Sequence, residues 1–161
     1  MTVTIGEDHS DEALLVAASI WADATAARDG LTQPVAPTVK LPGLRAALAL
    51  PGATLYTAAR DELSVGFVVL VPLGRRLEVR YLAVGPSAWG QGIAGELLAH
   101  VHQVAMTGGL EAIDLWVLAD NERAVAVYVR AGWAVTADVK SQVDTRRTEV
   151  RLERLVIRRE S

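Results

Sequence analysis

Helix-spaced and alternating apolar positions divide the chain into four helical and seven extended stretches. Leu14, Ala17, Ala18 and Trp21 recur at helical spacing after Ser10, whose side chain suits a helix N-cap. Helices are predicted over residues 10–30, 43–50, 93–106 and 121–131, and strands over residues 2–5, 53–59, 63–73, 76–84, 111–118, 132–139 and 148–157. Residues 31–43 contain three prolines and no periodic pattern, so we expect a loop there.

The strand predicted over residues 63–73 is almost continuously apolar, which indicates burial on both faces in the middle of a sheet. Turns at Asp61–Glu62 and Gly74–Arg75 require antiparallel neighbours, whereas the later strand–helix–strand units require parallel neighbours. The element order therefore predicts an α/β protein with a central mixed sheet.

Composition excludes several classes of function. The chain has 161 residues, which is typical of one domain, and we expect residues 1–161 to form it. It contains no cysteine, which removes disulfides, zinc–thiolate sites and cysteine nucleophiles. The net charge of −3 and the lack of a basic face argue against nucleic-acid binding. No apolar run approaches the ~20 residues of a membrane helix, and no signal peptide is recognised, so a cytoplasmic protein is expected.

A glycine-rich loop joins the strand over residues 76–84 to the helix over residues 93–106. Gly90, Gly92 and Gly95 spell G-x-G-x-x-G, and such a loop at a helix N-terminus can direct backbone N–H groups toward a phosphate. The same glycines would also suit a simple turn that packs a helix on a sheet. A dinucleotide-binding site is a weaker interpretation. In a Rossmann unit this loop follows the first strand, whereas here several strands precede it. Too few residues also follow the loop to form the second half of such a fold.

Residues 77–133 contain two sequence motifs. The first motif is a strand ending in L-x-V, a proline, and [QR]-x-x-G-x-[GA] opening a helix. This chain supplies Leu82, Ala83, Val84, Pro86, Trp89, Gly90, Gln91, Gly92, Ile93 and Ala94. Trp89 departs from this pattern, which most often has Gln or Arg at that position.

The second motif is a strand, an asparagine near a helix start, a tyrosine and a Gly-Phe pair. Here it reads as Asn121, Tyr128 and Gly132, with Trp133 in place of the phenylalanine. By these two motifs together, residues 77–133 resemble the GNAT superfamily of acyl-CoA-dependent N-acyltransferases. The resemblance implies a mixed sheet of six to seven strands flanked by about four helices.

The resemblance also implies a function, namely transfer of an acetyl group from acetyl-CoA to a primary amine of a small molecule or protein, by direct attack in a ternary complex. The cofactor contacts it implies are Leu82, Ala83, Val84, Gly90, Gln91, Gly92, Ile93, Ala94, Gly95, Asn121 and Tyr128. Family members often dimerise, so a homodimer is compatible with the resemblance. A non-catalytic acyl-CoA-binding module is the competing interpretation.

Glu78 and Tyr128 are the candidate catalytic residues by this resemblance. Alternation along the strand places Glu78 on one face with Arg80, Leu82 and Val84, so Glu78 is either a general base or half of a surface ion pair with Arg80. Tyr128 is either the acid that protonates the departing thiolate or a core tyrosine.

Other candidate residues have narrower roles. Asn121 is expected to cap a helix, alone or while also contacting the CoA arm. Backbone N–H groups near Leu82 to Val84 are the expected oxyanion donors. The histidines lack an acidic or cysteine cluster, so no metal site is expected. Trp21 and Trp116 are expected in the core.

Overall fold

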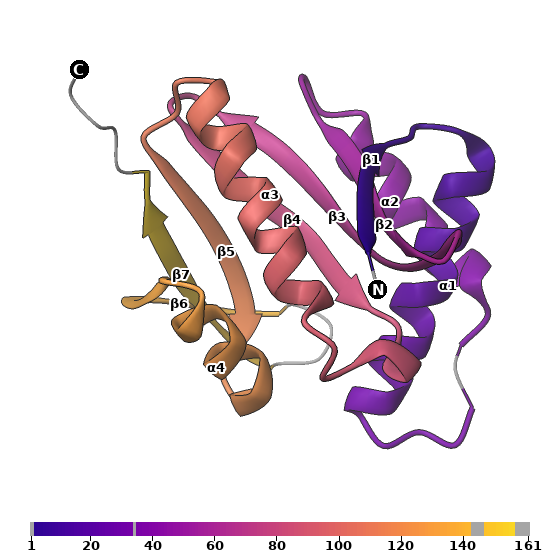
Figure 1. The fold of residues 1–161 in the computed structure, drawn as a ribbon. Coiled ribbons are helices and arrows are strands. Elements are labelled where there is room, and N and C mark those ends of the chain that lie inside the picture. The colour runs from indigo at the N-terminus through magenta and orange to yellow at the C-terminus, as the bar shows by residue number, and fades with distance from the viewer. Residues whose placement is uncertain (1, 34, 143–146, 157–161) are drawn as a thin grey trace.

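A seven-stranded mixed sheet forms the centre of the computed structural model, which describes residues 2–33, 35–142 and 147–156 (Figure 1). The strand order is β1-β2-β3-β4-β5-β7-β6, and β4 pairs with β5 in parallel while the other neighbours pair antiparallel. The strands are β1 (Val3–Glu7), β2 (Thr54–Arg60), β3 (Leu63–Leu73), β4 (Arg76–Val84), β5 (Ala112–Leu118), β6 (Ala134–Ser141) and β7 (Thr148–Leu155). The predicted mixed sheet is confirmed.

Helices cover both faces of the sheet. They are α1 (Asp11–Arg28), α2 (Leu41–Leu48), α3 (Ile93–Thr107) and α4 (Glu122–Arg130), with short 3₁₀ turns η1 (Pro37–Val39) and η2 (Pro86–Ala88). One apolar cluster joins α3 and α4 to the sheet, and a second joins α1 and α2 to the other face of β2, β3 and β4. The strand β3 contributes to both clusters, which confirms that it is buried on both faces.

The N-terminal connections differ in detail from the sequence-based expectation. The second helix begins at Leu41 rather than at residue 43, because Pro42 lies in its first turn, where a missing backbone N–H is tolerated. The predicted loop over residues 31–43 also contains η1. The turn expected around Asp144 lies outside the described residues.

A β-bulge in β4 overturns the predicted alternation of that strand. Val69 of β3 pairs with Tyr81, but the next residue, Leu70, pairs with Val79, which leaves Arg80 as an extra residue. Before the bulge, odd-numbered residues therefore face one side of the sheet, and after it even-numbered residues face that same side. Val79 and Leu82 consequently pack on the same face, and Glu78 does not share a face with Leu82 and Val84 as predicted.

Beyond the bulge, β4 and β5 separate. Their parallel register runs from Arg76 opposite Ala112 to Val79 opposite Leu115, although β4 continues to Val84 and β5 to Leu118. The other edge of β4 remains paired with β3 as far as Val84. Because backbone groups of a strand point alternately to its two edges, part of residues 80–84 directs N–H and C=O groups into this opening. We call the opening the β4–β5 splay.

No helix within the described ranges is long and apolar enough to span a bilayer.

Candidate active site

The glycine loop lies between the end of β4 and the first turn of α3. Gly90 and Gly92 have φ values of +79° and +81°, which side-chain-bearing residues rarely adopt. A Cβ placed on Gly90, Gly92 or Gly95 would meet no atom within 4 Å, so this side of the loop faces open space. The first intrahelical bond here runs from the Glu96 N–H to the Gly92 carbonyl, and the preceding N–H groups remain directed out of the helix. The loop is therefore an open cradle of backbone donors.

Trp89 is anchored immediately before this cradle. Its indole Nε1 donates a hydrogen bond of 2.7 Å to the carbonyl of Val84, the last residue of β4. The guanidinium carbon of Arg123, from the first turn of α4, lies 4.6 Å from the centre of the indole ring. A cation on α4 is thus placed beside the start of the glycine loop.

Asn121 directly precedes α4 and Tyr128 lies on it, as the second motif requires. The Asn121 side-chain oxygen accepts a hydrogen bond of 3.2 Å from the Ala124 N–H, so its predicted capping role is confirmed. Tyr128 is buried in the cluster on the α3 side, with its ring centre 5.9 Å from that of Trp133. Burial raises the pKa of the Tyr128 phenol to about 12. The hydroxyl therefore stays protonated at neutral pH and can act as a donor.

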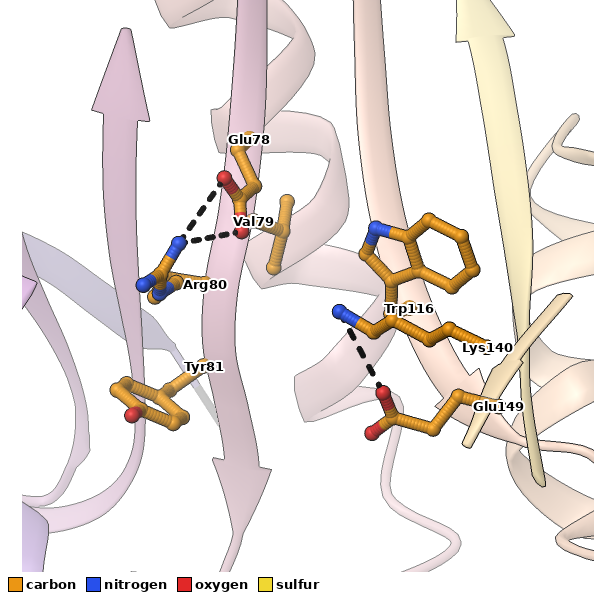
Figure 2. Close-up of a pocket in the computed structure, with 7 residues that line it drawn as sticks. All are labelled: Glu78, Val79, Arg80, Tyr81, Trp116, Lys140 and Glu149. Carbon is orange, nitrogen blue, oxygen red and sulfur yellow. Dashed lines mark hydrogen bonds and ion pairs between the residues drawn. The ribbon is translucent and has the colours of Figure 1, made fainter. Parts of the chain in front are cut away.

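A pocket of about 260 Å³ opens between the strands on the other face of the sheet. Figure 2 shows Glu78, Arg80 and Tyr81 on the β4 side. Arg80 Nη1 lies 3.1 and 3.3 Å from the two carboxylate oxygens of Glu78, so the predicted ion pair is present. The Glu78 side chain is 15% exposed and the Arg80 side chain 41% exposed, which places the carboxylate deeper than its partner.

The opposite wall of the pocket carries residues that the sequence did not identify. It consists of Trp116 from β5, Lys140 from β6 and Glu149 from β7. Lys140 Nζ lies 4.4 Å from the Trp116 ring centre and 3.6 Å from a Glu149 carboxylate oxygen. Trp116 is therefore a pocket residue and not a core residue as expected. The sequence predicted the β6 and β7 strands, but their register, which sets Lys140 opposite Glu149, carried no local signal.

The β4 wall is supported from behind by α1. The ring of Tyr81 lies 4.4 Å from the ring of Trp21, and the Tyr81 hydroxyl approaches the space above Gly43 in α2. A Cβ on Gly43 would lie 3.3 Å from that hydroxyl, so a larger residue would press on the pocket wall.

Glu78 and Tyr128 thus lie on opposite faces of the sheet. Glu78 lines the pocket, and Tyr128 packs in the α3-side cluster. His100 instead packs edge-on against Tyr56, and burial lowers the pKa of its imidazole. Within the described part of the chain, no group of three His, Asp or Glu side chains could hold a metal ion.

Comparison with known proteins agrees with this geometry. The sequence profile described as "Acetyltransferase (GNAT) family" matches residues 21–133. A mycothiol acetyltransferase from Brachybacterium faecium is 33% identical over 87 residues, which cover 51% of this chain and 26% of that protein. The chain thus spans about a quarter of the length of that relative.

Solved structures share the fold at lower sequence identity. The ribosomal-protein-S18-alanine N-acetyltransferase from Escherichia coli superposes with a TM-score of 0.77 at 18% identity, over 99% of this chain and 97% of that one. The PaiA N-acetyltransferase from Thermoplasma acidophilum, in complex with coenzyme A, gives 0.76 at 16% identity, over 96% and 99% of the two chains. The predicted fold is confirmed.

Proposed function

The chain belongs to the acetyltransferase (GNAT) family, and we propose that it transfers an acetyl group from acetyl-CoA to the primary amine of a small molecule or a protein. The observation that carries the proposal is the β4–β5 splay, which ends beside the open glycine cradle. The splay offers unpaired strand edges to an extended amide chain, and the cradle offers N–H donors to phosphates. The residues present therefore fit coenzyme A.

The proposed cofactor contacts divide into two groups. Backbone N–H groups of residues 90–95 would hold the diphosphate, because the loop is open and its donors converge at a helix N-terminus. Backbone groups of Leu82, Ala83 and Val84 would pair with the pantetheine amides in the splay. When bound, acetyl-CoA supplies the acetyl group as a thioester.

Glu78 is proposed to accept the proton of the acceptor amine, directly or through one water. An attacking amine must be neutral, whereas a free alkyl ammonium has a pKa near ~10.4. Glu78 is a carboxylate in the wall of a pocket large enough for a small amine, and Arg80 holds it through contacts with both carboxylate oxygens. The ion pair and the base role are compatible, because each carboxylate oxygen has more than one lone pair and can still accept a proton or a hydrogen bond from water.

Backbone N–H groups of Leu82 to Val84 that point into the splay are proposed to donate to the acetyl carbonyl oxygen as negative charge develops there. Tyr128 is proposed to donate its proton to the departing thiolate. Its phenol is buried and protonated, so it can give a proton at the end of the reaction and recover it from solvent afterwards.

The proposal is tested by measuring thiol release from acetyl-CoA in the presence of amine acceptors. The chain has no cysteine, so a thiol reagent reports coenzyme A without background from the protein. Calorimetric titration with acetyl-CoA, with NADH as control, measures binding separately. Binding of acetyl-CoA and turnover with an amine would support the proposal. Binding without turnover would favour an acyl-CoA-binding module, and preferential binding of NADH would reject the family assignment of the cradle.

We further propose that residues 1–161 act as one N-acetyltransferase domain in the cytoplasm, with a homodimer as a compatible assembly. Sedimentation of the purified chain would measure the assembly state.

A further inference from the structure

Arg123 holds a charge that no carboxylate neutralises within the described residues. Six other arginines each lie within 4.0 Å of a carboxylate, namely Arg28, Arg75, Arg76, Arg80, Arg147 and Arg151. Arg123 instead stacks on the Trp89 ring, and its side chain is exposed. Two acidic residues lie near it in sequence, Asp120 and Glu122. Asp120 is paired with Arg147 at 3.2 Å, and neither carboxylate forms an ion pair with Arg123.

Stacking on an aromatic face holds a guanidinium differently from an ion pair. The ring attracts the cation through its quadrupole and fixes the plane of the guanidinium, but it occupies none of the five N–H donors. Those donors radiate from the edge of the plane and remain able to bind an external anion. A planar guanidinium with free edges is well suited to a phosphate, which accepts paired hydrogen bonds.

The partner of Arg123 places this cation at the cradle. Trp89 directly precedes Gly90, and its indole is tied to the end of β4 by the bond to the Val84 carbonyl. The guanidinium therefore lies beside the loop whose N–H groups face open space. The indole N–H is the only hydrogen-bond donor of the Trp89 side chain and is already bonded to Val84, so this side chain offers no donor to a ligand in the cradle.

We infer that Arg123, held in place by Trp89, binds the diphosphate of coenzyme A and supplies from α4 the polar contact that position 89 does not provide. The inference rests on the proposed function, since it concerns the same cradle. Trp89 is a positioning residue in this arrangement, whereas Arg123 touches the cofactor. The loop and α4 would then close on the diphosphate from two sides.

The experiment compares the parent protein with Arg123→Ala and with Arg130→Ala as a matched control. Arg130 is exposed on the same helix, where its Nε lies 3.4 Å from the Ala126 carbonyl, and it does not contact Trp89. Binding of CoA and of dephospho-CoA, which keeps the diphosphate but lacks the 3′-phosphate, is measured by calorimetric titration at low salt. Turnover of S-acetylpantetheine, which lacks all the phosphates, is measured as kcat/KM.

We expect Arg123→Ala to weaken CoA and dephospho-CoA equally, by tenfold or more, and to leave S-acetylpantetheine turnover within twofold of the parent. Arg130→Ala should leave all three values unchanged. Unchanged CoA binding in Arg123→Ala would overturn the inference. Weaker binding of CoA with unchanged binding of dephospho-CoA would also overturn it, because Arg123 would then contact the 3′-phosphate and not the diphosphate. An equal loss with S-acetylpantetheine would indicate a structural role and would also overturn it.

Trp89→Leu tests the positioning role. It should weaken CoA binding in the parent but have little further effect when Arg123 is already Ala, because the two residues act through one contact. Additive losses would reject that coupling. If the parent protein binds no CoA, the proposed function itself is rejected. If the parent binds CoA and Arg123→Ala binds it equally well, only the inference about Arg123 is rejected. Circular dichroism and the Tm of each free variant establish that it is folded.

Discussion

Arg76 donates from Nε and Nη2 to the two carboxylate oxygens of Asp114, at 2.6 Å each, and so joins the two parallel strands at their paired end. Asp114 also accepts from Arg151 Nη1 at 2.7 Å, and Arg76 pairs with Glu153 of β7. This ionic cluster lies where the β4–β5 register is still intact. The strands are therefore clamped at the end that precedes the splay.

Asp114→Asn should destabilise the fold by about 1–3 kcal/mol at pH 7, because two half-buried guanidinium groups lose their shared anion. Urea unfolding would measure the free energy. Asp138→Asn is the control, since Asp138 also pairs with Arg151 but its side chain is 59% exposed, and we expect it to change stability by less than about 1 kcal/mol. Equal losses of unfolding free energy in the two variants would contradict the conclusion that Asp114 ties β4 to β5.

The Asp114 contribution should depend on acidity. Burial acts to raise the pKa of this carboxyl, but the hydrogen bonds and charges of Arg76 and Arg151 outweigh it and lower the pKa below its ordinary value. A lowered carboxyl pKa stabilises the fold above the unfolded-state value of ~3.9, and this stabilisation is lost as pH falls through the folded-state value. The difference between parent and Asp114→Asn should therefore shrink below about pH 4. A constant difference between pH 7 and pH 3 would contradict it.

Glu78→Gln should lower kcat by about 10²-fold or more while leaving the Kd for acetyl-CoA unchanged, because the amide cannot accept the amine proton. The rate of the variant should recover partly at high pH, where more of the acceptor is neutral. Glu111→Gln is the matched control, since Glu111 also pairs with an arginine, Arg75, at 2.8 Å, but lies outside the pocket. A Glu78→Gln kcat within threefold of the parent would leave the ion pair with Arg80 as its role.

Tyr128→Phe should lower kcat by tenfold or more with little change in acetyl-CoA affinity. Tyr56→Phe, in a half-buried tyrosine of β2, should leave kcat unchanged. If the Tyr128 variant lost affinity and kept its rate, the hydroxyl would be a binding contact and not an acid.

Ionisation of Tyr128 should also lower the stability of the fold at alkaline pH. The pKa of the Tyr128 phenol is 10.0 in the unfolded chain and about 12 in the folded protein. The protonated phenol therefore stabilises the fold fully below the unfolded-state pKa, and this stabilisation is lost as the pH rises toward the folded-state pKa. The parent should therefore lose about 2–3 kcal/mol more than Tyr128→Phe between pH 9 and pH 12. Unfolding in urea at each pH measures the difference. Parallel curves for the two proteins would contradict a raised pKa.

Gly92→Ala should cost about 1 kcal/mol of stability and abolish most CoA binding. The residue has a φ of +81°, and its missing Cβ leaves the cradle open. Gly74→Ala is a closely matched control, because Gly74 has a φ of +60° and open space around it but lies in the β3–β4 turn. The two variants should lose similar stability, while Gly74→Ala retains CoA affinity. If both variants retained affinity, the cradle would not hold the diphosphate.

The sequence predicted the parts of the site that depend on local physics. Asn121 precedes a helix and caps it, and the glycines mark a loop where side chains would intrude. Alternation and proximity along β4 also indicated that Glu78 and Arg80 would interact. Each of these features follows from residues only a few positions apart.

The predictions that failed concern features that depend on contacts between segments far apart in the sequence. No residue near Arg80 signals a bulge, because the bulge arises from how β3 and β4 match their registers. Trp116 is expected in the core, but β6 brings Lys140 over its ring, and the sequence near Trp116 does not signal this contact. Arg123 and Trp89 lie 34 positions apart, on α4 and before α3, so their stacking is seen only in the folded structure.

The bulge at Arg80 divides β4 into two halves of opposite parity. Before it, the odd positions Leu77 and Val79 face the α3-side core, and after it the even positions Leu82 and Val84 do so. A deep mutational scan should therefore tolerate charged residues at even positions in the first half and reject them at even positions in the second. Deleting Arg80 would remove the extra residue, so that Val79 and Tyr81 continue the pairing with β3 without a break and Glu78 keeps its face. A one-residue deletion elsewhere in β4 would instead reverse the faces of the residues on one side of it, and we expect it to be far more damaging than the loss of Arg80.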